Sequence, residues 1–324
     1  MIEKTARHLA GSESVLIVSH TNPDGDALSS SLALGLGLEK LNKKVTLVNE
    51  SPIPAVYRFL PSVDRISQNL SIETEFDTAV VVDCGDLERI GSAIQLVRNV
   101  QTLINIDHHV TNMAFGDIQF VEPGACATAE LVYRVLQRLA VNIDTEIATS
   151  IYTGILTDTG SFRFSNTNQA AFAICTEMAQ KGVDPYGVAQ HVYGTYSLGR
   201  IKLLNLALDS IEISGNGKLS IMTVTQDMLR ATNTQPEDVD GLIHYARRIE
   251  DVKVAAMIQE IRNGQDKSNN HHRFHVSLRS DGTIDVASIA AAYGGGGHSS
   301  AAGFGIAATL SEIKSEIAIL AEKL

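Results

Sequence analysis

Histidine and aspartate residues gather in four short segments of the sequence. The first segment, HTNPDGDA, contains His20, Asp24 and Asp26. Imidazole together with carboxylates suits Mn²⁺, Fe²⁺ or Zn²⁺, and a site rich in oxygen ligands favours Mn²⁺ or Mg²⁺. The run Asn-Pro-Asp-Gly is also favourable turn chemistry, so a solvated turn is the competing interpretation. Because a plain turn has no need for a histidine after an apolar run, the segment is a candidate metal site.

The second and third segments also follow apolar runs. In VVVDCGD, Asp83 could cap the next helix. Beside the first segment, however, it suits a carboxylate that bridges two metal ions about 3.5–4 Å apart. The third segment, DHH, contains Asp107, His108 and His109. A lone buried histidine is usually a core residue, but two after an aspartate indicate function. One imidazole could ligate a metal while the other faces substrate, and Asp107 could orient an imidazole.

The remaining candidates come from later segments. TDTGSF contains Asp158, which alone could be a turn or helix-end residue. A run of four glycines lets backbone N–H groups approach an anion, and its entropic cost argues against a merely flexible loop. Arginine and histidine beside it could add charge-assisted bonds to phosphate. The candidate anion-binding residues are Arg262, Arg279, Gly295, Gly296, Gly297 and His298.

The elements that must position these residues follow from hydrophobic patterning. Runs at 14–20, 78–86 and 102–109 are apolar almost throughout and end in the polar clusters. Such runs are typical of parallel strands buried on both faces, and their alternation with helical patterns predicts a doubly wound α/β domain with a mostly parallel sheet. Open α/β sheets bind ligands beyond the carboxyl ends of strands. A helix over 145–157 would end at Asp158.

The expected domain organisation has three parts. Residues 1–185 form the metal-binding catalytic domain, 186–212 a mostly helical linker, and 213–324 a second, smaller α/β domain. In the second domain, strands KLSIMTVT and VKVAAMIQEI flank an expected helix at 236–248, and a strand FHVSLRS follows. A length of 324 residues agrees with two domains.

Composition excludes several classes of protein. The net charge of −11 argues against charge-driven binding to long duplexes, although bound divalent cations would still allow a small phosphorylated substrate. Three cysteines without CxxC spacing, and no signal pattern or membrane-length apolar run, predict a cytoplasmic protein with reduced thiols. No Walker loop, GxSxG elbow or HExxH motif is present, so P-loop NTPases, serine hydrolases and zincins are excluded.

In this order, HTNPDGDA, VVVDCGD, IDHH and TDTGSFRF resemble the DHH phosphoesterase family. SLRS and GGGGHSSAAG look like the DHH-associated C-terminal domain. Length and layout are most similar to the nanoRNase/pAp phosphatase branch. The resemblance implies hydrolysis of RNAs of about two to five nucleotides, and of 3′-phosphoadenosine 5′-phosphate (pAp), to mononucleotides. It also implies two Mn²⁺ ions per site, with Mg²⁺ or Co²⁺ as substitutes, and makes a homodimer plausible.

The resemblance also assigns roles. One ion would be held by His20, Asp24 and Asp83, and the second by Asp26, Asp83, His108 and Asp158. His109 would contact the substrate phosphate, and Arg279, His298 and the glycine run would grip the far end, with Arg262 assisting. Water activated by the metals would attack in line. Three alternatives stay open: a cyclic di-AMP or pApA phosphodiesterase, an inorganic pyrophosphatase, and a non-catalytic nucleotide sensor.

Overall fold

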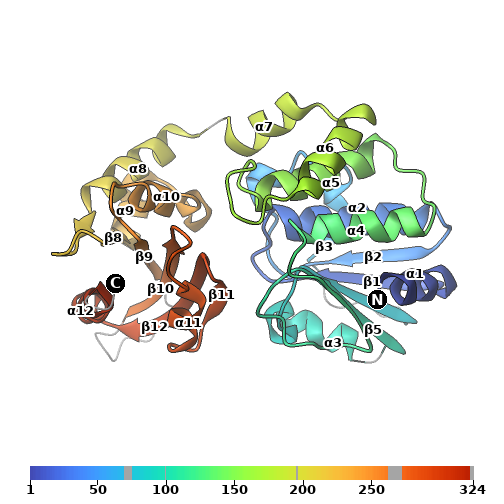
Figure 1. Ribbon diagram of the computed structural model, residues 1–324, viewed down its shortest axis with the longest axis horizontal. Helices are drawn as coiled ribbons and strands as arrows, with labels where there is room; N and C mark the ends of the chain where they lie inside the picture. Colours follow the sequence, from blue (N-terminus) through green and yellow to red (C-terminus); the bar gives the residue numbers. More distant parts are fainter. Residues whose placement is uncertain (69–74, 99, 195, 262–271, 322–324) are drawn as a thin grey trace. The chain divides into compact units, whose positions relative to one another are not determined.

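The computed structural model describes residues 1–68, 75–98, 100–194, 196–261 and 272–321. Arg262, one of the candidate phosphate-binding residues, lies outside this described part. The chain divides into two compact units, Met1–Thr195 and Tyr196–Leu324 (Figure 1). The segment 186–212 is therefore shared between the units, with α7 (Pro185–Tyr193) in the first and α8 (Leu198–Asp209) in the second. Its assignment as a linker stays a prediction.

The first unit is built on a sheet whose six strands all run parallel, in the order β3-β2-β1-β4-β5-β6. This order, which runs outward from β1 in both directions, confirms the doubly wound α/β fold. The strands are β1 (Ser14–Ser19), β2 (Lys44–Val48), β3 (Ile66–Ser67), β4 (Thr78–Val82), β5 (Thr102–Asp107) and β6 (Ile118–Val121).

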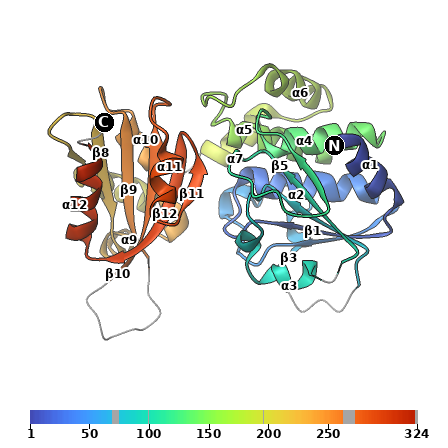
Figure 2. The ribbon, with the colours of Figure 1, turned by 60° about the horizontal axis from the view of Figure 1, so that its bottom comes forward.

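Alternate residues of the central strands fill two separate cores. Val15 and Ile17 of β1 lie in the core shared with the long helices, and Leu16 and Val18 point to the opposite core. The larger core is covered by α1 (Ile2–Gly11), α2 (Gly25–Glu39), α4 (Thr128–Arg138) and α5 (Thr145–Asp158), with α6 (Gln169–Gln180) and α7 packed on α5 (Figure 2). The smaller core is covered by η3 (Leu87–Ala93) and α3 (Ile94–Val97). Short 3₁₀ helices η1 (Ala55–Tyr57) and η2 (Val63–Arg65) complete the unit.

Two glycines allow α5 to approach α2 closely. A Cβ on Gly25 would lie 2.4 Å from Oγ1 of Thr157, and a Cβ on Gly154 would lie 2.8 Å from Oδ1 of Asp26 in α2. Neither position has room for a side chain, because interior packing leaves no such gaps. The close approach brings the C-terminal end of α5, which carries Asp158, to the N-terminal end of α2.

The second unit contains a mixed sheet in the order β11-β12-β10-β9-β8-β7, in which only the β8–β9 pair is parallel among the described pairs. Helices α11 and α12 cover one face, and α8, α9 and α10 cover part of the other. The further elements are β7 (Glu212–Ile213), β8 (Leu219–Val224), α9 (Gln226–Thr232), η4 (Pro236–Val239), α10 (Ile243–Arg247), β9 (Val254–Ile261), β10 (His272–Ser280), α11 (Val286–Ala291), β11 (Gly296–His298), β12 (Ala301–Ala308) and α12 (Leu310–Ala321).

One expectation about local structure was wrong. The single helix expected over 236–248 is two short helices, η4 and α10, because Gly241 between them has a φ of 84°, which no α-helix contains. At the end of the glycine run, residues 296–298 form β11 and pair with β12, which agrees with the argument against a flexible loop.

Candidate metal centre

Side chains from separate segments of the first unit meet beyond the carboxyl ends of β1, β4 and β5. Nε2 of His20 lies 3.7 Å from Oδ2 of Asp83, and Nε2 of His108 lies 3.9 Å from Oδ1 of Asp83. Oδ2 of Asp158 lies 3.5 Å from Nε2 of His108. These separations are long for hydrogen bonds. Two ligand atoms bonded at about 2.1 Å to one ion lie about 3.0–4.2 Å apart, so the spacing fits shared cations.

Asp83 occupies the middle of this cluster. Its two oxygens point to different histidines, Oδ2 to His20 and Oδ1 to His108, as a carboxylate that bridges two ions requires. Its φ of 54° lies in the left-handed region that few non-glycine residues adopt. A hydrogen bond from its N–H to the carbonyl of Ile106 (3.0 Å) ties this backbone to β5. Strained backbone of this kind concentrates at functional sites.

Hydrogen bonds fix which nitrogen of each histidine is available. Nδ1 of His20 lies 2.8 Å from the carbonyl of Thr21, and Nδ1 of His108 lies 3.2 Å from the carbonyl of Ala125. A carbonyl can only accept, so both Nδ1 atoms carry the hydrogen. The neutral ring then presents the lone pair of Nε2, which faces the carboxylates. This is the arrangement by which backbone carbonyls orient metal-ligating histidines.

The two aspartates of the first segment are held differently. Oδ1 of Asp24 accepts from the N–H groups of Asp26 and Ala27 and caps α2. The carboxylate of Asp26 accepts from the N–H groups of Thr128 (2.6 Å) and Ala129 (3.0 Å), at the N-terminus of α4. A helix N-terminus favours a negative charge, which opposes part of the effect of burial on Asp26.

The expected ligand atoms fall into two groups that share Asp83, and a third group joins Asp83 to Asp107 and His109. Atoms of His20, Asp24 and Asp83 lie within 4.8 Å of one another, and so do atoms of Asp26, Asp83 and His108. The structure thus brings together the expected ligands of two adjacent ions, with Asp158 reaching the second group through His108. The assignment of each residue as a ligand stays a proposal.

The electrostatics of the cluster also favour bound cations. Burial, together with the charges of Asp83 and Asp158, holds the pKa of Asp26 well above its usual range. Burial is also the main reason that the pKa of Asp158 rises to about 7. Burial opposes the charged form of His108, but the charges of Asp158, Asp26 and Asp83 raise its pKa to about 9. Buried carboxylates that destabilise one another in this way are relieved by divalent cations, which would replace the protons.

His109 is held by a hydrogen bond to the carboxylate of Asp107. Its Nδ1 donates to Oδ1 of the buried Asp107 at 2.6 Å, which fixes the orientation of the ring. Nδ2 of Asn112 donates to Oδ2 of Asp107 at 2.6 Å and to Oδ1 of Asn105 at 2.8 Å. Burial raises the pKa of Asp107, but the hydrogen bond and charge of His109 outweigh this and hold it below its usual value. The pair could therefore act as an oriented imidazole with an ionised carboxylate behind it.

Three residues near the site were not found from the sequence. Thr128 donates from its N–H to Asp26 and from Oγ1 to Oδ1 of Asp83 (2.8 Å). Asn166 donates to Oδ2 of Asp158 at 2.9 Å, and Asn112 holds Asp107. None of them belongs to the residue types that usually bind metals, so residue type and spacing gave no signal. The only hint was that Thr128 precedes an apolar helical pattern.

The second unit places two of the expected phosphate-binding residues in one row. Arg279 of β10 and His298 of β11 both pair with Ala301 of β12, so the side chains of all three residues lie on the same face of the sheet. A Cβ on Gly295 would lie 2.2 Å from the carbonyl of Gly303, so Gly295 is required by packing. Gly297 has a φ of 144°, and Gly296 faces open space. The anion-binding role of this row and of the glycines stays a proposal.

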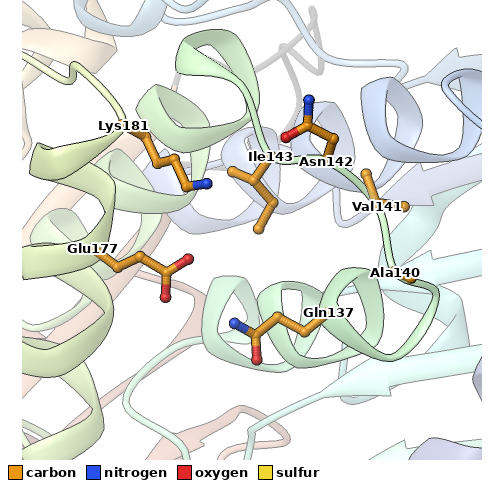
Figure 3. A pocket seen from close by; sticks show the side chains of 7 residues that line it. All are labelled: Gln137, Ala140, Val141, Asn142, Ile143, Glu177 and Lys181. Atoms are coloured by element: carbon orange, nitrogen blue, oxygen red, sulfur yellow. The ribbon is translucent and has the colours of Figure 1, made fainter.

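One pocket of the first unit lies apart from this chemistry. It has a volume of about 300 Å³ and lies between the C-terminal end of α4, the turn after it and α6 (Figure 3). Its lining residues are Gln137, Ala140, Val141, Asn142, Ile143, Glu177 and Lys181. Thr128, which contacts the candidate metal ligands, begins α4 at the other end. None of the candidate metal ligands lines this pocket.

Family models match both units. The "DHH family, N-terminal domain" matches residues 14–155, and the "DHHA1 domain" matches residues 217–323. The bifunctional oligoribonuclease and PAP phosphatase NrnA of Thermus thermophilus is 32% identical, over 89% of this chain and 83% of that protein. The chain belongs to the DHH family.

Two further proteins are similar over most of the chain. A protein of Bacillus cereus (strain B4264) named "Probable manganese-dependent inorganic pyrophosphatase" is 28% identical, over 76% of this chain and 79% of its own. The crystal structure of an exopolyphosphatase-related protein from Bacteroides fragilis has a TM-score of 0.88 and 27% identity, and covers 99% of this chain and 96% of its own. Among the described helices, none has the length and apolar character needed to cross a membrane.

Proposed function

We propose that this protein is a two-metal phosphoesterase that hydrolyses very short RNAs and pAp to mononucleotides. The observation that carries the proposal is the pair of ligand groups that share Asp83, because two adjacent cations are the centre that in-line phosphoryl transfer to water uses. The substrate class is supported by the relative from Thermus thermophilus, which is named for oligoribonuclease and PAP phosphatase activity.

The metals we propose are two Mn²⁺ ions, with Mg²⁺ or Co²⁺ as substitutes. His20, Asp24 and Asp83 would hold one ion, and Asp26, Asp83, His108 and Asp158 the other. Mixed imidazole and carboxylate ligands support this choice. The pyrophosphatase relative carries manganese in its name. Cytoplasmic location and a homodimer stay predictions.

Divalent cations bound at this centre would supply a hydroxide near neutral pH and neutralise charge on the phosphoryl oxygens. The residues of the chain prepare the geometry. Thr128 and the N-terminus of α4 hold Asp26 and Asp83 in place before substrate arrives. In its protonated form His109, kept in orientation by Asp107, would donate a hydrogen bond from Nε2 to the phosphoryl group. In the second unit, Arg279, His298 and Gly295, Gly296 and Gly297 would bind the far end of the substrate, with Arg262 assisting.

A substrate panel tests this function. The purified protein is incubated with Mn²⁺ and separately with pAp, the dinucleotide pApA, cyclic di-AMP and pyrophosphate, and products are resolved by chromatography. We expect AMP from pAp and from pApA. Preferred cleavage of cyclic di-AMP would instead favour the phosphodiesterase alternative, and cleavage of pyrophosphate alone the pyrophosphatase alternative. No turnover of any of the four would contradict the proposal.

The Asp83→Ala variant tests the shared ligand. We expect it to abolish metal-dependent hydrolysis and to lower the number of Mn²⁺ ions bound per chain. The matched control is Asp64→Ala, because Asp64 is an exposed aspartate in η2 of the same unit. Substantial turnover by the Asp83 variant would contradict the assignment of Asp83 as the carboxylate between two ions.

A further inference from the structure

An exposed arginine lies beside the loop that carries His20 and Asp24. The N–H of Thr21 donates to the carbonyl of Arg89 at 2.8 Å, and Nδ1 of His20 donates to the carbonyl of Thr21 at 2.8 Å. Arg89 follows Asp83 by six residues, on the connection that leaves the carboxyl end of β4. The backbone of Arg89 is therefore fixed next to the His20 side of the candidate metal centre.

Glu50, which follows β2, holds the chain just after this arginine. Its Oε2 accepts from the N–H of Ser92 at 2.8 Å and from the Ser92 hydroxyl. Gly91 has a φ of 64°, and a Cβ there would lie 2.1 Å from Oε1 of Glu50. Only glycine fits this turn, so residue 91 keeps the backbone next to Arg89 in a fixed conformation.

The neighbours of Glu50 hold the facing loop. Nδ2 of Asn49 donates to the carbonyl of His20 at 2.8 Å, and Oγ of Ser51 accepts from the N–H of Asn22 at 2.8 Å. Three consecutive residues after β2 thus tie the loop at 20–24 and the turn at 89–92 to one another. Because this backbone is already fixed, only the side chain of Arg89 would lose conformational freedom on binding a ligand.

The guanidinium of Arg89 has no partner within this network. The residue is exposed, and its side chain makes no hydrogen bond or ion pair with the part of the chain that the structure describes. The donors of the guanidinium are therefore available to a ligand.

We propose that Arg89 binds the phosphate group of the substrate at the His20 side of the metal centre. This inference rests on the proposed function, because its ligand is the phosphate of a phosphoester. The planar guanidinium matches two phosphoryl oxygens with two parallel hydrogen bonds, which a lysine cannot reproduce. The chain carries 37 acidic and 26 basic side chains. An arginine that lies at a carboxylate-rich site without a carboxylate partner is therefore available to an anionic ligand.

Equilibrium binding of inorganic phosphate to the full-length, Mn²⁺-loaded protein tests the proposal without requiring turnover. The variants are Arg89→Ala and Arg89→Lys. The matched control is Arg98→Ala, because Arg98 is also exposed and lies on the same β4–β5 connection, shortly before the start of β5 at the opposite edge of the sheet. Calorimetry gives the phosphate affinity, and the signal of free Mn²⁺ in electron paramagnetic resonance gives the metal affinity.

We expect Arg89→Ala to lower phosphate affinity about ten- to hundredfold, the loss typical of hydrogen bonds to charged groups. Arg89→Lys should recover part of it, and Arg98→Ala should match wild type. Mn²⁺ affinity should stay unchanged in all variants. Wild-type phosphate affinity in Arg89→Ala, an equal loss of Mn²⁺ affinity, or no measurable phosphate binding by wild type would each overturn the proposal. Failure to cleave pAp or pApA while phosphate binding depends on Arg89 would count against the proposed function alone.

Discussion

Replacement of Thr128 by valine removes one hydroxyl from between the two ligand groups. Thr128 is fully buried, and its Oγ1 lies 2.8 Å from Oδ1 of the buried Asp83. Valine has nearly the same shape and keeps the backbone N–H that donates to Asp26 at 2.6 Å. The variant therefore isolates a single hydrogen bond to a charged group, which contributes about 1.5–3 kcal/mol.

That free energy corresponds to a loss of about ten- to hundredfold in Mn²⁺ affinity, since each 1.4 kcal/mol is about a factor of ten. The range agrees with the effect of removing residues that hold metal ligands in orientation. Titration of the metal-free variant with Mn²⁺ by calorimetry measures it. The matched control is Thr153→Val, because Thr153 is equally buried and its hydroxyl, among the residues that the structure describes, bonds only the carbonyl of Thr149. If both variants bind Mn²⁺ as wild type does, the role of Thr128 in holding Asp83 is refuted.

Three further perturbations test other parts of the structure. Gly154→Ala would put a Cβ 2.8 Å from Oδ1 of Asp26, so we expect about 1–3 kcal/mol of destabilisation by urea denaturation and weaker Mn²⁺ binding. An effect no larger than that of Gly215→Ala, where the space is open, would count against this. Arg279→Ala should raise KM for dinucleotides far more than for a small generic phosphodiester; equal effects would remove the proposed grip on the far end. Burial raises the pKa of Asp77, but N–H groups of Ser14 and Glu13 lower it below its usual value. The loss of stability caused by Asp77→Asn should thus be largest above about pH 4 and should shrink as the pH falls further. A loss of stability that does not depend on pH would contradict this explanation.

The sequence determined the fold class and the edge of the sheet at which the chemistry gathers. Apolar runs of strand length, separated by helical patterns, indicate buried parallel strands because both faces of such a sheet are covered. His20 and Asp83 directly follow two of these strands, and Asp107 ends a third. Carboxyl ends of neighbouring parallel strands meet at one edge, so local patterning alone was enough to bring these segments together.

Only the tertiary structure decided how the side chains are held. Thr128 contacts Asp26 across 102 residues and Asp83 across 45, and no local pattern encodes contacts over such distances. The same holds for Glu50 and Ser92, which fix the backbone beside Arg89. Hydrogen-bond partners of this kind depend on which helix ends and loops pack against one another. Periodicity specifies the elements, whereas the orientation of each carboxylate and imidazole is set by packing between segments that are distant in the chain.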